Sequence, residues 1–250
     1  IVKTANPDAY ILGEIWDGSP RWVGDGMFDG LMHYPFREMV IHYLNGNQSA
    51  NEFTQKALHW VKAYPYENTL SMYLPLGTHD TPRISTMLNG NIPKIRLAFL
   101  LQFTFPGAPA IYYGDEIGME GGKDPDCRRA YPVEILNWQA ELRKWVQTLA
   151  KWRKNLPELR RGTFMPVVPL QSQTQCLIYA RVLEKASSLV IVNAGTTAEE
   201  LTIPVETLGW DEGSIVQNLL GTEDYLPNNH HLHLTIPPGT AMLLKPDGRV

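Results

Sequence analysis

The sequence has few cysteines and no long apolar run. Its two cysteines, Cys127 and Cys176, are far apart and outside any metal-binding spacing, which is typical of free thiols in a reducing compartment and allows one disulfide at most. No stretch approaches the roughly 20 apolar residues of a membrane-spanning helix. Basic residues are not in excess, because 22 lysines and arginines stand against 26 acidic residues. The composition therefore argues against a membrane protein and against a nucleic-acid-binding protein.

The sequence begins at Ile1, without an initiator methionine or a signal-peptide pattern. We therefore expect residues upstream of Ile1 to have been removed, so the N-terminus gives no information about targeting. The 250 residues are enough for one large domain or two ordinary ones.

The first part of the chain alternates between strand and helix patterns. Short apolar runs between turn residues predict strands over 8–16, 28–34, 69–77 and 108–114. Helical periodicity predicts helices over 49–63, 91–105 and 137–154. The fold class is therefore α/β. The pattern alone allows a doubly wound sheet of four or five strands or part of a (β/α) barrel, which closes only with eight.

The pattern changes after Pro157. Short β-branched runs recur between turn signals, which is typical of an antiparallel β-sandwich. We therefore expect two domains, 1–156 and 157–250.

Polar residues follow several of the predicted strands, where catalytic residues of α/β proteins gather. Glu14 follows an apolar run, and apolar neighbours would raise its pKa and keep it protonated for proton donation. Trp16 offers a flat apolar face for a sugar ring. His79 and Asp80 are able to hydrogen-bond neighbouring hydroxyl groups, and such bonds help most when they tighten in an oxocarbenium-like transition state.

Plainer interpretations remain open for Glu14, for Asp80 and for the nearby Arg83. Glu14 alone would be an ordinary loop acid. Asp80 would be the N-cap of a helix beginning at Thr81 and Pro82. Arg83 would be an i,i+3 partner of Asp80.

Two further groups of residues suggest metal sites, but a plainer interpretation is favoured for both. Asp124 and Asp126 have the ligand type that calcium prefers, yet two acids fall short of an oxygen cage, which favours a solvated turn. His231 and His233 alternate with leucines, which favours an exposed sheet face.

Three motifs, taken in order along the chain, resemble the α-amylase superfamily of glycoside hydrolases. They are LGEIWD (12–17), THDTPR (78–83) and GAPAIYYGDEIGMEGGKDPDCRR (107–129), and FDGLMHYPF (28–36) and residues 141–162 support them. The nearest likeness is to the cyclomaltodextrinase, neopullulanase and maltogenic amylase group. It is strong from about residue 1 to 165 and rests mainly on architecture beyond that.

The resemblance implies specific roles for the candidate residues. Glu14 matches the family's general acid/base, and Asp80 matches its transition-state-stabilising aspartate. His79 matches the histidine that binds the sugar beside the scissile bond. Trp16 and Arg83 match positions that line the same cleft. Thr78 stands where the family usually has asparagine or serine, a departure that retains a hydroxyl.

A second departure concerns the nucleophile. In the family, an aspartate preceded by an arginine lies on the fourth barrel strand, and residues 1–7 resemble the end of the helix that follows it. The resemblance thus implies strands five to eight of a TIM-type (β/α)₈ barrel, followed by an antiparallel β-sandwich. We expect the longer parent to be a retaining hydrolase that cleaves α-1,4 glucosidic bonds, with α-1,6 bonds as a second linkage class, and this chain alone to be inactive.

The expected partners follow from the same resemblance. The substrate would be an α-glucan oligosaccharide or a cyclodextrin, and the open half-barrel would associate with its missing N-terminal half or with itself. No cofactor is expected, since calcium is not supported by the sequence. The resemblance and the low cysteine content favour the cytoplasm. A non-catalytic carbohydrate-binding subunit and an α-glucosyltransferase of the same superfamily remain as alternatives.

Overall fold

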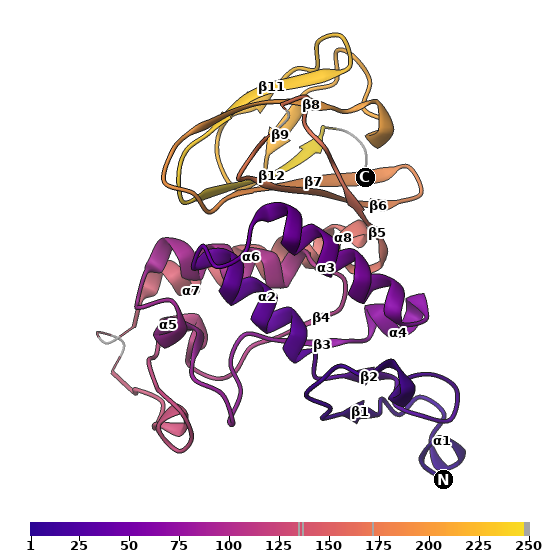
Figure 1. The fold of residues 1–250 in the computed structure, drawn as a ribbon, viewed down its shortest axis with the longest axis vertical. Coiled ribbons are helices and arrows are strands. Elements are labelled where there is room, and N and C mark those ends of the chain that lie inside the picture. Colours follow the sequence, from indigo (N-terminus) through magenta and orange to yellow (C-terminus); the bar gives the residue numbers. More distant parts are fainter. Residues whose placement is uncertain (135, 137, 172, 248–250) are drawn as a thin grey trace.

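The computed structural model describes residues 1–134, 136, 138–171 and 173–247. Its first part alternates strands and helices, and its second part is built of antiparallel strands, as the α/β fold class and the change of pattern predict (Figure 1). The first part contains α1 (Val2–Ala5), β1 (Leu12–Gly13), η1 (Pro20–Trp22), β2 (Gly30–Leu31), α2 (Tyr34–Leu44), α3 (Ala50–Ala63), α4 (Tyr66–Leu70), β3 (Tyr73–Pro75), α5 (Ile84–Met87), α6 (Ile92–Thr104), β4 (Ala108–Ala110), η2 (Asp115–Ile117), η3 (Asp126–Arg128), α7 (Ala140–Asn155) and α8 (Pro157–Arg161).

The strands of the first part are short and parallel, and they follow one another in chain order. β1 pairs with β2, and β3 pairs with β4. A parallel bridge between Met32 and Tyr73 joins the two pairs. The carboxyl ends of all these strands therefore meet at one edge, which is where ligand sites form in parallel α/β proteins.

Local sequence signals explain where the main helices begin. Ser49 and Glu52 form the predicted capping box at the start of α3, because each side chain bonds the backbone of the other. Pro35 lies in the first turn of α2, and the Asn91 side chain accepts a hydrogen bond from the backbone N–H of Lys94 at the start of α6. α6 is buried nearly all round, so it lies in the centre of the helical layer.

The second part folds into two antiparallel sheets. Its strands are β5 (Thr163–Pro166), β6 (Leu177–Leu183), β7 (Ala186–Asn193), β8 (Glu199–Pro204), β9 (Val216–Asn218), β10 (Asp224–Tyr225), β11 (His231–Ile236) and β12 (Thr240–Pro246), with η5 at Glu206–Leu208. Six strands form one sheet in the order β10-β9-β12-β7-β6-β5, and β8 pairs with β11 in the other. A hydrophobic cluster that includes Ile191, Ile203 and Leu234 joins the sheets.

The larger core crosses from the helices into the six-stranded sheet. The hydrophobic cluster of this larger core contains Phe36 of α2, Phe99 of α6 and Val190 of β7. Polar contacts follow the same seam: the Tyr179 hydroxyl lies 2.6 Å from that of Thr104. The sheet is therefore seated on the helical layer, at the opposite end of the molecule from β1 and β2 (Figure 1).

The structure differs from the sequence expectations mainly in the strands. The predicted helices over 49–63 and 91–105 are confirmed as α3 and α6. The strand predicted over 69–77 is shorter, because its first residues close α4. The helix predicted from 137 begins at Ala140, and residue 137 itself lies outside the described residues.

Two further findings concern the cysteines and the helices. Cys127 and Cys176 are both free, as predicted, and both are buried. Among the described residues, every helix is too short or too polar to pass through a lipid bilayer.

Candidate active site

Three of the predicted site residues converge at the carboxyl edge of the parallel strands. Glu14 directly follows β1, whereas His79 and Asp80 lie in the loop after β3. One carboxylate oxygen of each acid and one ring nitrogen of His79 all lie within 4.8 Å of one another. The two acids therefore share one site although 65 residues of sequence separate them.

Glu14 lies beside two aromatic rings. The Tyr34 hydroxyl donates a hydrogen bond of 3.5 Å to Oε1 of Glu14, and the Tyr34 ring stacks on Trp16 at a centroid distance of 4.0 Å. Burial raises the pKa of the Tyr34 phenol above its ordinary value, so the phenol stays protonated and able to donate.

The expectation that Glu14 is surrounded by apolar groups is wrong for this chain. Its side chain is exposed, and Trp16 is 53% exposed. The physical reason is the position of β1, which lies at one edge of the parallel strands and has no neighbour on its far side among the described residues.

Asp80 is held by groups on both of its carboxylate oxygens. His79 Nε2 lies 3.2 Å from Oδ2, and Arg128 Nη2 donates to Oδ1 at 3.0 Å. The backbone N–H of Asp80 donates to the Thr78 hydroxyl at 3.2 Å. The alternative that Asp80 caps a helix is wrong, because the helix that follows begins at Ile84 with Arg83 at its N-cap and no side-chain capping bond.

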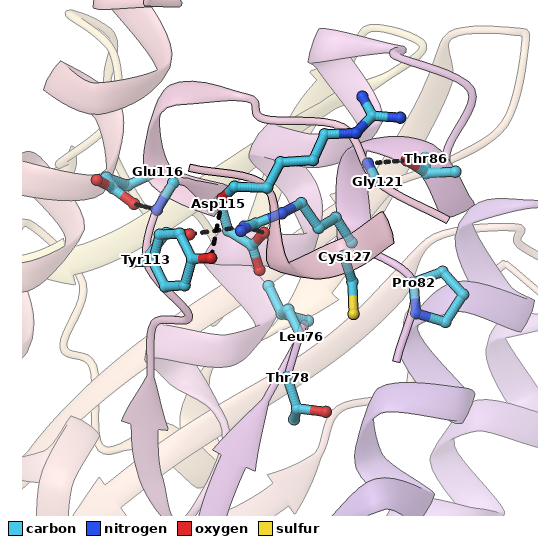
Figure 2. Close-up of polar contacts among 12 residues, drawn as sticks. Leu76, Thr78, Pro82, Thr86, Tyr113, Asp115, Glu116, Gly121 and Cys127 are labelled. Atoms are coloured by element: carbon cyan, nitrogen blue, oxygen red, sulfur yellow. Dashed lines mark hydrogen bonds and ion pairs between the residues drawn. The ribbon is translucent and has the colours of Figure 1, made fainter. Parts of the chain in front are cut away.

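Arg83 does not face the shared site. Its side chain is fully buried, and Nη1 donates to the Tyr113 carbonyl at 2.6 Å and to Asp115 Oδ1 at 3.0 Å. Figure 2 shows these two partners, Tyr113 and Asp115, close together. Its guanidinium also lies 4.6 Å from the centroid of the Tyr112 ring. Both the expected place in the cleft and the alternative pairing with Asp80 are therefore wrong, since the partner is an aspartate 32 residues further along.

Asp115 is the counterpart of Arg83 and is equally buried. Burial raises the pKa of its carboxyl from 3.8 to about 7, and the nearby Arg83 guanidinium opposes that rise. The pair joins the loop after β3 to the loop after β4. It therefore helps to fix the end of the loop that carries His79 and Asp80.

Sequence reasoning missed two residues that contact the candidate acids. Tyr34 lies in the motif FDGLMHYPF and Arg128 lies in the loop after β4, 20 and 48 residues from their partners. The motifs were the only signal that would have found them. Arg128 also binds Asp124 at 2.7 Å, and Arg129 binds Asp126 at 2.8 Å.

The shared site also has the donor types of a metal centre. Two carboxylates and an imidazole are able to bind a divalent cation. However, the Arg128 guanidinium occupies one oxygen of Asp80 and places a positive charge at the site, which opposes a second cation. The arginine pairs also occupy Asp124 and Asp126, and His231 and His233 lie on β11 at positions that alternate with buried leucines.

Comparison with known proteins relates the whole chain to one group. A family model described as "Alpha amylase, catalytic domain" matches residues 1–166. A cyclomaltodextrinase from Geobacillus thermopakistaniensis (strain MAS1) is 35% identical over 238 residues, covering 95% of this chain and 40% of the relative. Neopullulanase 2 from Thermoactinomyces vulgaris is 34% identical over 247 residues, covering 98% of this chain and 41% of the relative.

A solved structure gives the same result for the fold. The native form of a debranching enzyme from Nostoc punctiforme superposes with a TM-score of 0.86 at 32% identity, covering 97% of this chain and 53% of that chain. The chain thus spans about two fifths of the length of the curated relatives it matches.

Proposed function

The chain belongs to the α-amylase family of glycoside hydrolases, and from this we propose that the protein containing it cleaves α-1,4-glucosidic bonds in maltodextrins or cyclodextrins, with α-1,6 bonds as a second linkage class. The observation that carries the proposal is the meeting of Glu14 and Asp80 within 4.8 Å at one strand edge. The names of the matching relatives, a cyclomaltodextrinase and a neopullulanase, support the same substrate class.

Glu14 acts as the proton donor to the glycosidic oxygen in this proposal. It is the carboxyl of the pair that is free of a cationic partner among the described residues, and its one described side-chain contact is the Tyr34 hydroxyl. A general acid needs a proton that it is able to give to the leaving group, and a nearby arginine would remove that proton by stabilising the carboxylate.

Asp80 and His79 hold the sugar instead of attacking it. Both oxygens of Asp80 have partners, Arg128 on one side and His79 on the other, which fix the carboxylate in place. A carboxylate fixed in this way is suited to bind ring hydroxyls, and those bonds strengthen as the ring flattens toward an oxocarbenium ion.

The aromatic pair beside Glu14 provides an apolar surface for a sugar ring. Trp16 and Tyr34 are stacked almost parallel, at an interplanar angle of 4°, and Trp16 is about half exposed. Such a face suits the C–H side of a glucose ring while the hydroxyl groups point to polar partners.

Neither Glu14 nor Asp80 takes the part of the carboxylate that attacks the sugar in a retaining enzyme. Retaining glycosidases use a nucleophile roughly 5–5.5 Å from the acid to form a covalent intermediate. By the family resemblance that aspartate lies upstream of the first strand, so we propose that the 250-residue chain does not turn over substrate by itself.

The same reasoning extends to the architecture. We propose that β1 to β4 are strands five to eight of an eight-stranded barrel within residues 1–156, and that residues 157–250 form a β-sandwich domain. The parallel order of the strands and the two packed sheets support this division. The outer strands β1 and β4 then leave unpaired edges that an N-terminal half-barrel or a second copy would cover.

The test compares the complete gene product with the isolated chain. Both are incubated with cyclodextrin and with maltotriose, and released sugars are measured. We expect the complete product to cleave both and Glu14→Gln to lower its kcat by about 10²–10⁴-fold. The exposed Glu38 on α2 gives a matched control, and Glu38→Gln is expected to leave kcat unchanged.

Two results would contradict the proposal. Undiminished cleavage by the Glu14→Gln complete product would refute the acid assignment. If the isolated chain turns over substrate and Glu14→Gln abolishes that turnover, the proposed inactivity of the chain is refuted. Adding maltose as an acceptor separates hydrolysis from glucosyl transfer, since transfer yields longer oligosaccharides.

A further inference from the structure

The loop that carries His79 and Asp80 has little internal support. Residues 77–83 form turns and bridges outside the named helices and strands. Inside the loop, Thr78 and Thr81 hold each other through their hydroxyls at 3.1 Å, and the N–H of Asp80 donates to the Thr78 hydroxyl. These are local bonds, so the placement of the loop relative to the rest of the site depends on groups outside it.

Arg37, on the first turns of α2, reaches both ends of this loop. Its Nε donates to the Leu76 carbonyl at 2.8 Å, and its Nη2 donates to the Pro82 carbonyl at 2.7 Å. The side chain is only 8% exposed. The planar guanidinium has donors at a fixed angle, so two simultaneous bonds set both the distance between the two carbonyls and their orientation.

The same helix also carries the contact to the other half of the site. Tyr34 lies one turn before Arg37 on α2 and donates to Glu14. Residues three apart on a helix share a face. α2 therefore connects the strand-end acid Glu14 with the loop that holds Asp80.

We propose that Arg37 is a positioning residue that sets the place of His79 and Asp80 relative to Glu14 for the cleavage proposed above. It touches neither carboxylate and acts through the backbone at Leu76 and Pro82. The inference rests on the proposed function only for its effect on catalysis, because the bracing of the loop is a property of the fold.

The competing interpretation is that Arg37 merely stabilises the fold, and Arg181 offers a matched control. Arg181 is fully buried and also donates to backbone carbonyls, those of Thr104, Leu159 and Gly162, but at the seam between helices and sheet. Arg37→Met and Arg181→Met both remove a buried guanidinium. Only the first removes it from the loop that carries His79 and Asp80.

The first measurement is hydrogen exchange in the 250-residue chain. The amides of Thr78, Asp80 and Thr81 report the state of the loop, since each donates within it. We expect Arg37→Met to speed their exchange at least about tenfold relative to the wild type and Arg181→Met to leave it unchanged. Arg37→Lys retains the charge without the two donors at a fixed angle, so its exchange rates at these amides are expected to lie between those of Arg37→Met and Arg181→Met.

The second measurement is steady-state cleavage of maltotriose by the complete gene product. We expect Arg37→Met to lower kcat by about 10–100-fold with KM changed less than about threefold, because a loop displaced by an ångström loses bonds that matter most in the transition state. Arg37→Lys should recover part of the loss. Arg181→Met should keep the kcat of the folded protein.

Each outcome decides the matter. Equal exchange at these amides in Arg37→Met and the wild type overturns the bracing, and an equal loss of kcat in Arg37→Met and Arg181→Met overturns the positioning role. If Arg37→Met does not fold, Arg37→Lys is compared with the wild type by the same two criteria. Exchange does not depend on sugar cleavage, so a failure of the proposed function is a separate result.

Discussion

Gly77 is the first residue of the loop that carries His79 and Asp80, and it leaves no room for a larger side chain. A Cβ atom at this position would lie 2.3 Å from Oδ2 of Asp115, well inside the contact distance of carbon and oxygen. Asp115 is 1% exposed and its other oxygen is bonded to Arg83, so the carboxylate cannot turn away without breaking a buried ion pair. We therefore expect Gly77→Ala to destabilise the chain by about 3 kcal/mol, the upper end of the range for overpacking.

Thermal and urea unfolding of the 250-residue chain measure this effect. For a chain of this size, about 3 kcal/mol corresponds to a fall of about 6–12 °C in the unfolding midpoint. Gly122 is the matched control, because a Cβ there would meet Asp126 Oδ2 at 3.4 Å, an ordinary contact. Gly122→Ala should therefore stay within about 0.5 kcal/mol of the wild type.

A double variant checks the assigned cause. Asp115→Ala alone leaves the Arg83 charge unpaired and should cost about 3–5 kcal/mol. If the clash is real, adding Gly77→Ala to it costs little more, since the obstructing oxygen is gone. Equal stabilities of Gly77→Ala and Gly122→Ala, or full additivity in the double variant, would refute the reasoning.

Three further predictions concern stability. Burial raises the pKa of Asp115 from 3.8 to about 7, so its contribution to the free energy of unfolding is complete below about pH 4 and is lost as the pH rises through about 7. At 1.36 kcal/mol per pKa unit the loss is at most about 4 kcal/mol. Unfolding measured across this pH range should show the fall in stability in the wild type and not in Asp115→Asn. Ser49→Ala removes the capping box of α3 and should cost about 1 kcal/mol in urea unfolding, whereas no loss would mean that the cap is dispensable. Lys245→Met breaks a 2.7 Å ion pair with the fully buried Glu158 and should cost about 3 kcal/mol, but Lys144→Met in an exposed pair should cost less than about 0.5 kcal/mol, and similar losses would contradict the burial argument.

The sequence was sufficient to predict where the candidate acids would meet. Glu14 and the pair His79 and Asp80 each follow an apolar run, and parallel strands bring their carboxyl ends to one edge. The helices were equally accessible, because caps such as Ser49 and the apolar periodicity are local signals. These features depend on neighbours within a few residues along the chain.

Arg83 shows what local reasoning could not supply. It stands three residues after Asp80, so pairing along the chain was a reasonable alternative, yet its partner Asp115 comes from the loop after the next strand. The roles of Tyr34 and Arg128 depend likewise on tertiary folding. The exposure of Glu14 also escaped prediction, because it is decided by the absence of a covering strand among the described residues.

The seam beneath the six-stranded sheet bears on the construction of chimeras between relatives. Arg181 is held by backbone oxygens of Thr104, Leu159 and Gly162, which any amino acid at those positions would provide as long as the main chain follows the same path. The hydroxyl pair of Thr104 and Tyr179 is different, since both side chains must be inherited together. A β-rich part exchanged with that of a divergent homologue should therefore graft more readily when this pair and the Lys245–Glu158 ion pair are kept matched.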